Sequence, residues 1–237
     1  MSLKRPDAQY TSGKYLRDNP SWDIEDSPWK AQKVVEMLSG VGLSPDSVCE
    51  VGCGAGGVLA SLRSVYPNVD LFGFDIAPDA ACFWEDHGNL DIHFQMGDFF
   101  NLNRKRYDLL LVLDVIEHVV DPWTFLEGLK PWSEHILLHF PLDLSAQNIL
   151  RETPVLEARR QVGHIHYFTK NLALELLNEA GYRIDQWSYS GLARSGPRSS
   201  WRSRLALLPR VLAYALNKDA GVRLLGGETL FVLASPK

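Results

Sequence analysis

Cysteine is scarce in this sequence: three occur in 237 residues, at Cys49, Cys53 and Cys82. A small, odd number without paired C-x-x-C spacing excludes a disulfide framework and a cysteine-based zinc module, and it fits a reducing compartment. The chain also lacks an apolar run as long as a membrane span. No long apolar core follows the basic residues at the N-terminus, so we expect no signal peptide and a cytoplasmic location.

Positively charged residues are fewer than negatively charged ones: the sequence has 24 Lys and Arg and 29 Asp and Glu, which gives a net charge of −5. This deficit argues against a general affinity for nucleic acid, and we expect no nucleic-acid partner. Residues 191–226 are the exception, with seven Lys or Arg and one acid, Asp219. A basic amphipathic helix there would contact an anionic surface such as a membrane. The alternative is a lid helix that packs on its own domain.

A glycine-rich stretch, VCEVGCGAGG at 48–57, organises the rest of the sequence. It predicts a short buried strand, a sharp turn and a helix whose free N–H groups point at a ligand. Gly52, Gly54 and Gly57 fit the dinucleotide pattern G-x-G-x-x-G. Gly52, Gly54 and Gly56, with Glu50 before them, fit a second pattern, E-x-G-x-G-x-G. A glycine turn without any ligand is the remaining alternative.

Glu50 helps to decide between the two patterns. The end of a strand in a parallel sheet is normally apolar, and a buried carboxylate is costly unless it has a partner. A cationic ligand group beside the turn would supply that partner. The second pattern is therefore favoured.

Two further acids follow strands. Asp75 ends the predicted strand 70–75, at the spacing of an acid that accepts hydrogen bonds from ribose hydroxyls. Asp98 follows the strand 90–95 and precedes Phe99, so it is a candidate for an adenine amino group, with apolar side chains against the ring. The alternatives are a helix-capping acid for Asp75 and a turn aspartate for Asp98.

Apolar periodicity predicts strands that alternate with helices along most of the chain. The predicted strands are 48–51, 70–75, 90–95, 107–113, 134–140, 182–190 and 228–235. The predicted helices are 28–38, 58–65, 78–87, 121–129, 146–151 and 169–181. This alternation predicts an α/β fold with a doubly wound, mostly parallel sheet. The last two strands lack a regular crossover helix between them, so we expect them to pair antiparallel.

The first 26 residues show no clear period and predict a loosely structured arm. Ser27 reads as an N-cap with Pro28 at the first helical position. Trp22, Trp29 and Lys30 either cover the mouth of a ligand site or pack on the edge of the sheet.

Taken together, residues 45–190 and the final strand resemble the class I S-adenosylmethionine-dependent methyltransferases, in particular their small-molecule branch. The glycine turn carries the resemblance together with Asp75, Asp98, the VLDVIEHV stretch at 112–119 and the HIHYF stretch at 164–168. It implies a Rossmann-like seven-stranded sheet whose last strand is antiparallel and inserted before the sixth. The domain organisation would be an arm and cap helix at 1–44 and a methyltransferase domain at 45–237 with the basic insertion.

The resemblance also implies which residues bind S-adenosylmethionine. The turn would hold the methionine portion, Asp75 the ribose with Ile76 against the adenine, Asp98 and Phe99 the adenine edge, and 113–115 the region of the sulfonium. The implied cofactor residues are Glu50, Gly52, Cys53, Gly54, Gly56, Asp75, Ile76, Asp98, Phe99, Leu113 and Val115.

The implied activity is methyl transfer to a small-molecule or glycan- or lipid-type acceptor, with oxygen as the expected acceptor atom. The sequence lacks the N-P-P-Y motif of amino-group methylation on bases or glutamine, and it lacks the acidic metal set of catechol-type enzymes. Histidine titrates in the range useful for a general base, so His118, His164 and His166 are the candidates. Each is alternatively a structural residue.

Other interpretations remain open at this stage. We expect no metal, although His164 and His166 with Glu117 are an alternative metal-ligand set. An NAD(P)-dependent oxidoreductase is the main rival function, and a non-catalytic partner-binding protein that retains the pocket is a third.

Overall fold

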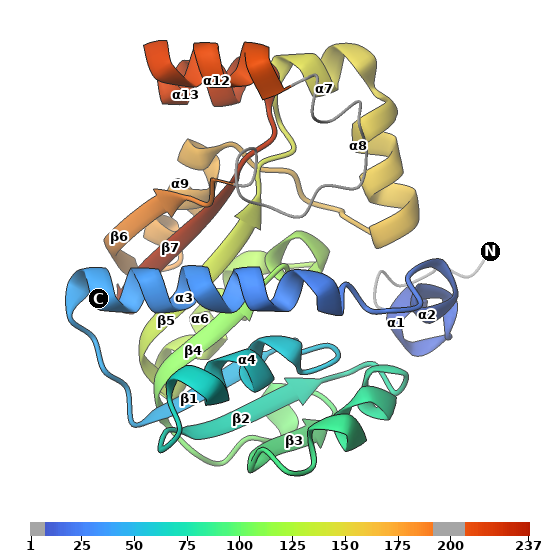
Figure 1. Cartoon of the computed structure of the whole chain (residues 1–237), viewed down its shortest axis with the longest axis vertical. Coiled ribbons are helices and arrows are strands. Elements are labelled where there is room, and N and C mark those ends of the chain that lie inside the picture. Colours follow the sequence, from blue (N-terminus) through green and yellow to red (C-terminus); the bar gives the residue numbers. More distant parts are fainter. Residues whose placement is uncertain (1–7, 192–206) are drawn as a thin grey trace.

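The computed structural model describes residues 8–191 and 207–237, which form a seven-stranded sheet with helices on both faces (Figure 1). The order of the strands is β3-β2-β1-β4-β5-β7-β6. The strands are β1 (Ser47–Val51), β2 (Asp70–Asp75), β3 (Ile92–Met96), β4 (Tyr107–Leu113), β5 (Ser133–Pro141), β6 (Tyr182–Tyr189) and β7 (Thr229–Pro236). All neighbours from β3 to β5 pair parallel, whereas β7 runs antiparallel to both β5 and β6. The predicted fold class is confirmed.

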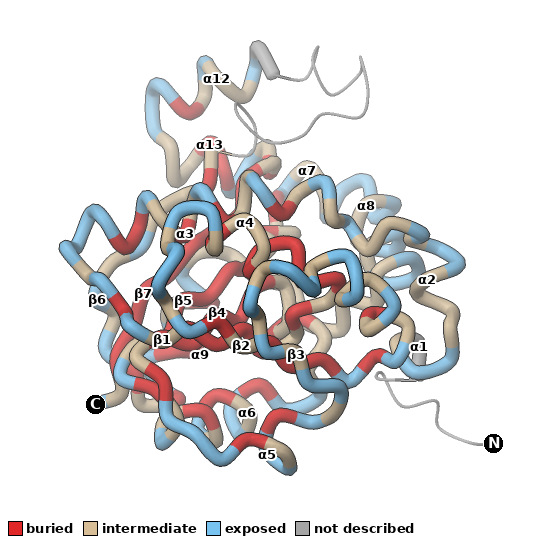
Figure 2. The backbone as a smooth tube through the Cα atoms, turned by 60° about the horizontal axis from the view of Figure 1, so that its bottom comes forward, coloured by how far each residue is buried: buried red, intermediate tan, exposed pale blue. Residues whose placement is uncertain are grey.

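The centre of the sheet is built from the most apolar strand, β4. Six of its seven residues are buried, as expected for a parallel strand covered on both faces. It pairs with β1 on one side and with β5 on the other. Figure 2 shows the buried residues gathered along these central strands.

The helices bury one apolar stripe each against the sheet, and they divide between its two faces. On one face lie α3 (Ser27–Val41) and α4 (Gly57–Val65), which share a core with β1, β2 and β4. On the other lie α5 (Phe99–Leu102), α6 (Pro122–Leu129) and α9 (Lys170–Glu179). The prediction of α6 from Asp121-Pro122 to Leu129 is correct because its signals are local: the Asp121 side chain accepts from Thr124 N–H, and Pro122 occupies the first turn.

The N-terminal segment differs from the expected loose arm. It contains α1 (Ala8–Thr11), α2 (Lys14–Asp18) and the 3-10 turn η1 (Ile24–Asp26). Long-range contacts order it, because the Tyr10 hydroxyl donates to the Val162 carbonyl at 2.8 Å and Lys14 donates to the Arg160 carbonyl at 3.3 Å. The predicted N-cap is also wrong: Ser27 is the first residue of α3, and its neighbour Asp26 is the cap.

The long connection between β5 and α9 carries α7 (Ala146–Arg151), α8 (Thr153–Glu157) and the π-turn η5 (Ala158–Val162). The remaining short elements are the 3-10 segments η2 (Ala80–His87), η3 (Ile116–His118) and η4 (Lys130–Trp132). The segment predicted as a helix at 78–87 is thus a 3-10 helix. In the β5–α9 connection, η5 contacts α2 of the N-terminal segment. These two parts of the chain therefore lie together beyond one end of the sheet.

The C-terminal part of the basic segment forms α12 (Leu207–Leu216) and α13 (Lys218–Leu225). These helices pack on the domain through Tyr214 and Val222, which are buried in the same core as residues of β5 and β7. The Tyr214 hydroxyl also donates to the Gly226 carbonyl, which joins α12 to the end of α13. Lys218 pairs with Glu228 at 3.0 Å. Four of the seven basic residues, Arg194, Arg198, Arg202 and Arg204, lie outside the described residues, so contact with an anionic surface stays a prediction. Within the described ranges, no helix has both the length and the apolar character that a bilayer crossing requires.

Candidate active site

A cavity of about 1100 Å³ opens at the carboxyl ends of β1, β2 and β4. Successive strands run outward in opposite directions from β1 and β4, which makes this the topological switch point where open α/β sheets bind ligands. The cavity exceeds the roughly 1,000 Å³ at the upper end of ordinary single-ligand pockets. It therefore has room for more than one small molecule.

The glycine turn after β1 forms one wall of this cavity. Gly52 has φ +79°, and a Cβ there would lie 2.5 Å from Cγ2 of Val115, so only glycine lets the turn pack against the end of β4. Gly56 has φ +78°, and a Cβ there would lie 2.5 Å from the Phe94 ring. Gly56 does not line the cavity, whereas Gly52, Cys53 and Gly54 do. The Gly56 position is therefore set by packing between the turn and β3.

Glu50 is a buried acid in the cavity wall with an unused oxygen. Its side chain is 3% exposed, and its Oε2 has no hydrogen-bond partner among the described residues. Burial raises the pKa of Glu50 to about 8, and the nearby Lys30 ammonium opposes that rise. An acid in this state favours a ligand that brings positive charge and N–H donors.

Asp75 lies beside the turn at the end of β2. Its Oδ2 accepts from Gly54 N–H at 2.7 Å, and its Oδ1 accepts from Ala77 N–H at 2.8 Å. Burial raises the pKa of Asp75, and these N–H bonds partly offset the rise. The acid thus holds the turn in shape as well as lining the cavity next to Ile76.

Asp98 follows β3 and lines the same cavity with Phe99. Its Oδ1 accepts from the N–H groups of Phe100 at 2.8 Å and Asn101 at 3.2 Å, so Asp98 caps α5. The alternative considered from the sequence was a turn aspartate, and the structure gives Asp98 the more specific role of a helix cap. The contact of Asp98 with adenine stays a prediction. Leu113 and Val115 also line the cavity, at the end of β4.

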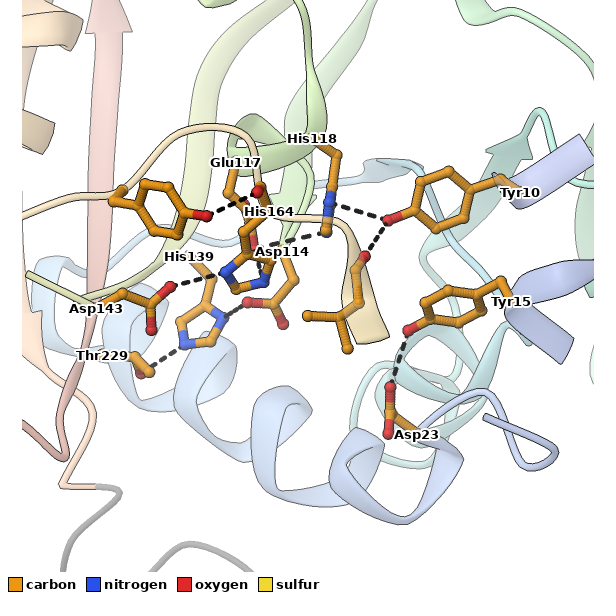
Figure 3. A network of polar contacts seen from close by, with 12 residues as sticks. Tyr10, Tyr15, Asp23, Asp114, Glu117, His118, His139, Asp143, His164 and Thr229 are labelled. Carbon is orange, nitrogen blue, oxygen red and sulfur yellow. Dashed lines mark hydrogen bonds and ion pairs between the residues drawn. The ribbon is translucent and has the colours of Figure 1, made fainter. Parts of the chain in front are cut away.

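Asp114 connects three elements at the end of β4. It has φ +54°, and its carboxylate lies 2.8 Å from Lys30 Nζ and 2.7 Å from His139 Nδ1. His139 Nε2 is in turn 2.6 Å from the Thr229 hydroxyl on β7 (Figure 3). Burial opposes ionisation of Asp114, but His139 and Lys30 hold its pKa well below the ordinary value. Neither His139 nor Thr229 was singled out from the sequence. The pairing of β4 with β5 brings His139 to Asp114, and the pairing of β5 with β7 brings Thr229 to His139.

A second polar cluster lies farther along the cavity wall, formed by Glu117, His118 and His164. Glu117 Oε1 lies 3.9 Å from His118 Nε2 and 3.8 Å from His164 Nε2. The other ring nitrogens are held: His118 Nδ1 is 2.9 Å from the Tyr10 hydroxyl, and His164 Nδ1 is 2.7 Å from Asp143 Oδ2 (Figure 3). We call these three residues the Glu-His-His cluster.

The structure brings His118 and His164 together but leaves His166 apart. His166 is not among the described residues that line the cavity, although its N–H donates to the Glu117 carbonyl at 3.1 Å. Burial and the neighbouring His164 lower the pKa of His118 to about 4, so its imidazole is neutral at pH 7. Burial raises the pKa of Glu117 well above its ordinary value.

Aromatic side chains from the N-terminal segment cover the cavity. Tyr10, Tyr15 and Trp22 all line it, with ring centroids 5.0 Å apart for Tyr10 and Tyr15 and 4.8 Å apart for Tyr15 and Trp22. Trp22, Trp29 and Lys30 were considered for this position from the sequence, and all three line the cavity. The two tyrosines were missed because a short polar segment shows no periodic signal.

The residues present fit the cofactor that the sequence implies. A nucleoside with a charged amino-acid tail needs an unpaired acid for its ammonium, backbone N–H groups for its carboxylate, and apolar surface for its ring. Glu50 Oε2 and the apolar lining around Phe99 supply the first and the third of these features in one cavity. The N–H groups of the turn glycines donate within the protein, so the second feature falls to the first turn of α4, which lines the cavity through Gly57 and Val58.

Comparison with known proteins gives a consistent result. Residues 25–186, more than half of the chain, match a family model described as a methyltransferase domain. A curated relative, (S)-tetrahydroprotoberberine N-methyltransferase of Eschscholzia californica, is 22% identical over 172 residues. That match covers 67% of this chain and 49% of the relative, so the chain spans about half the length of the curated relative.

Solved structures share the fold along nearly the whole chain. The plantazolicin methyltransferase BpumL, in complex with a monoazolic analogue and SAH, has a TM-score of 0.65 and 16% identity, covering 98% of this chain and 93% of that one. Magnesium protoporphyrin IX methyltransferase from Synechocystis PCC 6803, with bound SAH, has a TM-score of 0.61 and 14% identity, covering 98% and 97%. Because the sequence identities are this low, the similarity to these structures shows a shared fold alone.

Proposed function

The chain belongs to the methyltransferase domain family, and from this premise we propose that it transfers a methyl group from S-adenosylmethionine to an oxygen of a small-molecule acceptor. When bound, the cofactor supplies an electrophilic methyl group on a sulfonium. The observation that carries the proposal is one large cavity with an unpaired acid, Glu50, beside the glycine turn and a separate Glu-His-His cluster along its wall.

At the cofactor end, the chain's task is to bind and align. Glu50 would pair with the ammonium of the methionine portion, and Asp75 would accept from the ribose hydroxyls. Lys30 and His139 hold Asp114 ionised at the end of β4, and this network ties α3 and β5 together in the cavity wall. Alignment of the acceptor with the methyl group accounts for much of the rate that such a protein can supply.

At the acceptor end, the Glu-His-His cluster supports an oxygen nucleophile. A hydroxyl loses its proton during methyl transfer, and groups that accept or displace that proton assist the step. Neutral His118, and His164 backed by Asp143, face the same cavity as the cofactor residues. The curated relative's name specifies an N-methyltransferase, so an amine is the alternative acceptor to test.

The experiment has two stages. Calorimetry or thermal shift compares S-adenosylhomocysteine with NAD(P), and the first should bind while the second should not. Incubation with S-adenosylmethionine and matched panels of phenols, carboxylic acids and amines is then followed by mass spectrometry. Methylated phenol or acid supports the proposal. Methylation of amines alone refutes the oxygen assignment, and cofactor binding without transfer on any panel favours a non-catalytic partner-binding protein.

A further inference from the structure

We propose that Glu117, His118 and His164 form a three-ligand site for a divalent transition-metal ion in the wall of the cavity (Figure 3). Glu117 Oε1 lies 3.9 Å and 3.8 Å from the two imidazole Nε2 atoms, and the three ligand atoms all lie within 4.8 Å of one another. Metal–ligand bonds of about 2.0–2.2 Å allow two ligands of one ion to be about 4 Å apart. Small side-chain rotations therefore suffice to close the site.

The hydrogen bonds of His118 leave Nε2 with its lone pair. The Tyr10 hydroxyl donates its single hydrogen to the Val162 carbonyl at 2.8 Å. Toward His118 Nδ1, 2.9 Å away, Tyr10 can therefore only accept. Nδ1 carries the proton, and Nε2 faces Glu117 as a ligand atom.

His164 is prepared in the same way. Its Nδ1 lies 2.7 Å from Asp143 Oδ2, the distance of a charge-assisted hydrogen bond with Nδ1–H as donor. A carboxylate behind a histidine is the usual arrangement that orients a metal-binding imidazole and raises its basicity. Nε2 of His164 is thus the second nitrogen ligand.

Glu117 lacks the partners that would explain it as a structural residue. Its side chain is fully buried, and neither carboxylate oxygen accepts a hydrogen bond from any residue in the described ranges. The two Nε2 atoms are too distant for a hydrogen bond, even if Glu117 carried a proton. Its own carbonyl accepts from Ile165 and His166 N–H, which ties the His164 segment to η3 and keeps the three ligands together. A cation among them would satisfy the carboxylate.

The ligand set also selects the kind of ion. Two imidazole nitrogens and one carboxylate suit Zn²⁺, Fe²⁺ or Mn²⁺, whereas Mg²⁺ and Ca²⁺ prefer oxygen ligands. Three protein ligands leave coordination positions open to the cavity. If the proposed function holds, these positions face the acceptor and favour one with an oxygen donor. This departs from the expectation of no metal, and it replaces His166 by His118 in the alternative ligand set.

The test measures metal binding directly. Chelator-treated protein with Cys82→Ser, which removes an exposed thiol, is dialysed against Zn²⁺, Mn²⁺ or Mg²⁺, and bound metal is quantified by mass spectrometry. We expect about one Zn²⁺ or Mn²⁺ per chain, little Mg²⁺, and a metal-induced rise in melting temperature. Glu117→Gln and His164→Ala should abolish saturable binding, and Asp143→Asn should weaken it by about 10- to 100-fold. The control is His93→Ala, an exposed histidine on β3, which should bind metal like the parent.

S-adenosylhomocysteine binding is measured on every variant to separate this inference from the proposed function. Variants that bind it normally but lose the metal support the site. Parent protein that binds it but takes up no more Zn²⁺ or Mn²⁺ than Glu117→Gln overturns the metal site and leaves the methyltransferase proposal standing. Specific metal uptake without any binding of S-adenosylhomocysteine would support the site and refute the proposed cofactor.

Discussion

Lys30 Nζ lies 2.8 Å from Asp114 Oδ2, so that a cation from α3 meets an anion at the end of β4 in the lining of the cavity. Asp114 holds a left-handed backbone conformation, with φ +54°, and His139 contacts its other oxygen. Burial opposes the charge on Lys30, but Asp114 more than compensates and raises the pKa of Lys30. The pair therefore joins the cap helix to the sheet where the cofactor is expected to bind.

Removing the cation from this pair should destabilise the protein. For Lys30→Met we expect a loss of about 1–3 kcal/mol in the free energy of unfolding, because Asp114 loses its ammonium partner and, within the described residues, keeps only the contact with His139 Nδ1. Lys33→Met is the matched control on the same helix, since Lys33 pairs with exposed Glu36 and should cost under about 0.5 kcal/mol. Urea denaturation measures both. Equal losses in the two variants would contradict the role assigned to Lys30.

Glu50 should make stability depend on pH. Its pKa is about 8 in the folded chain and 4.5 ordinarily, so the folded state holds the proton more tightly. The stability associated with this proton is fully present below pH 4.5 and is lost as pH rises through about 8. Glu50→Gln should therefore gain stability relative to the parent as pH rises from 5 to 9, by a few kcal/mol at most. Thermal unfolding at several pH values measures the difference, and a constant difference would refute the assignment.

Glu50 should also make cofactor binding depend on pH, and in the opposite direction from its effect on stability. A cationic ligand pairs with ionised Glu50, so affinity for S-adenosylhomocysteine should rise as pH increases toward 8. Glu50→Gln should weaken binding by about 1.5–3 kcal/mol at pH 8 and remove most of the pH dependence. Isothermal calorimetry in buffers of different ionisation enthalpy gives both the affinity and the proton released. Unchanged affinity in the variant would show that Glu50 does not contact the ligand.

Asp75→Ala should weaken cofactor binding by about 1–3 kcal/mol through lost hydrogen bonds. The structure adds a second effect, because Asp75 also accepts from Gly54 and Ala77 N–H and its loss should lower the stability of the free protein. Asp75→Asn is the control, since its amide oxygen retains one acceptor. Calorimetry and thermal unfolding are measured together. Normal affinity for the cofactor product in Asp75→Ala would contradict the ribose assignment.

Gly56 and Gly42 provide a paired test of the turn. Both have positive φ, +78° and +70°, but a Cβ at Gly42 meets open space whereas one at Gly56 would lie 2.5 Å from the Phe94 ring. Gly42→Ala should lower the free energy of unfolding by about 1 kcal/mol, because the alanine must adopt the left-handed backbone conformation. Gly56→Ala should lower the free energy of unfolding by about 2–4 kcal/mol, because the clash with the Phe94 ring adds to the conformational cost. Chemical denaturation measures the difference, and similar costs would mean that Phe94 moves aside freely.

The local signals of the sequence were sufficient for most elements. The strands 70–75 and 107–113 and the helix 146–151 were predicted with the bounds that the structure shows. Continuous apolar runs mark buried parallel strands, and capping residues mark helix ends, so both can be recognised from a few neighbouring residues. The prediction that β7 is inserted between β5 and β6 came from the family resemblance, because apolar periodicity does not give the order of the strands.

What the sequence by itself determined is the frame: alternating strands and helices, a glycine turn beside Glu50, and acids at strand ends. Only the tertiary structure decided which side chains meet: His139 with Asp114, Tyr10 with His118, and His118 rather than His166 with Glu117 and His164. Apart from the adjacent Glu117 and His118, these residues are separated by many positions, and their contacts depend on strand register and on the course of long loops. A local pattern carries no such information, because burial and capping act between neighbours whereas a site forms where distant segments converge.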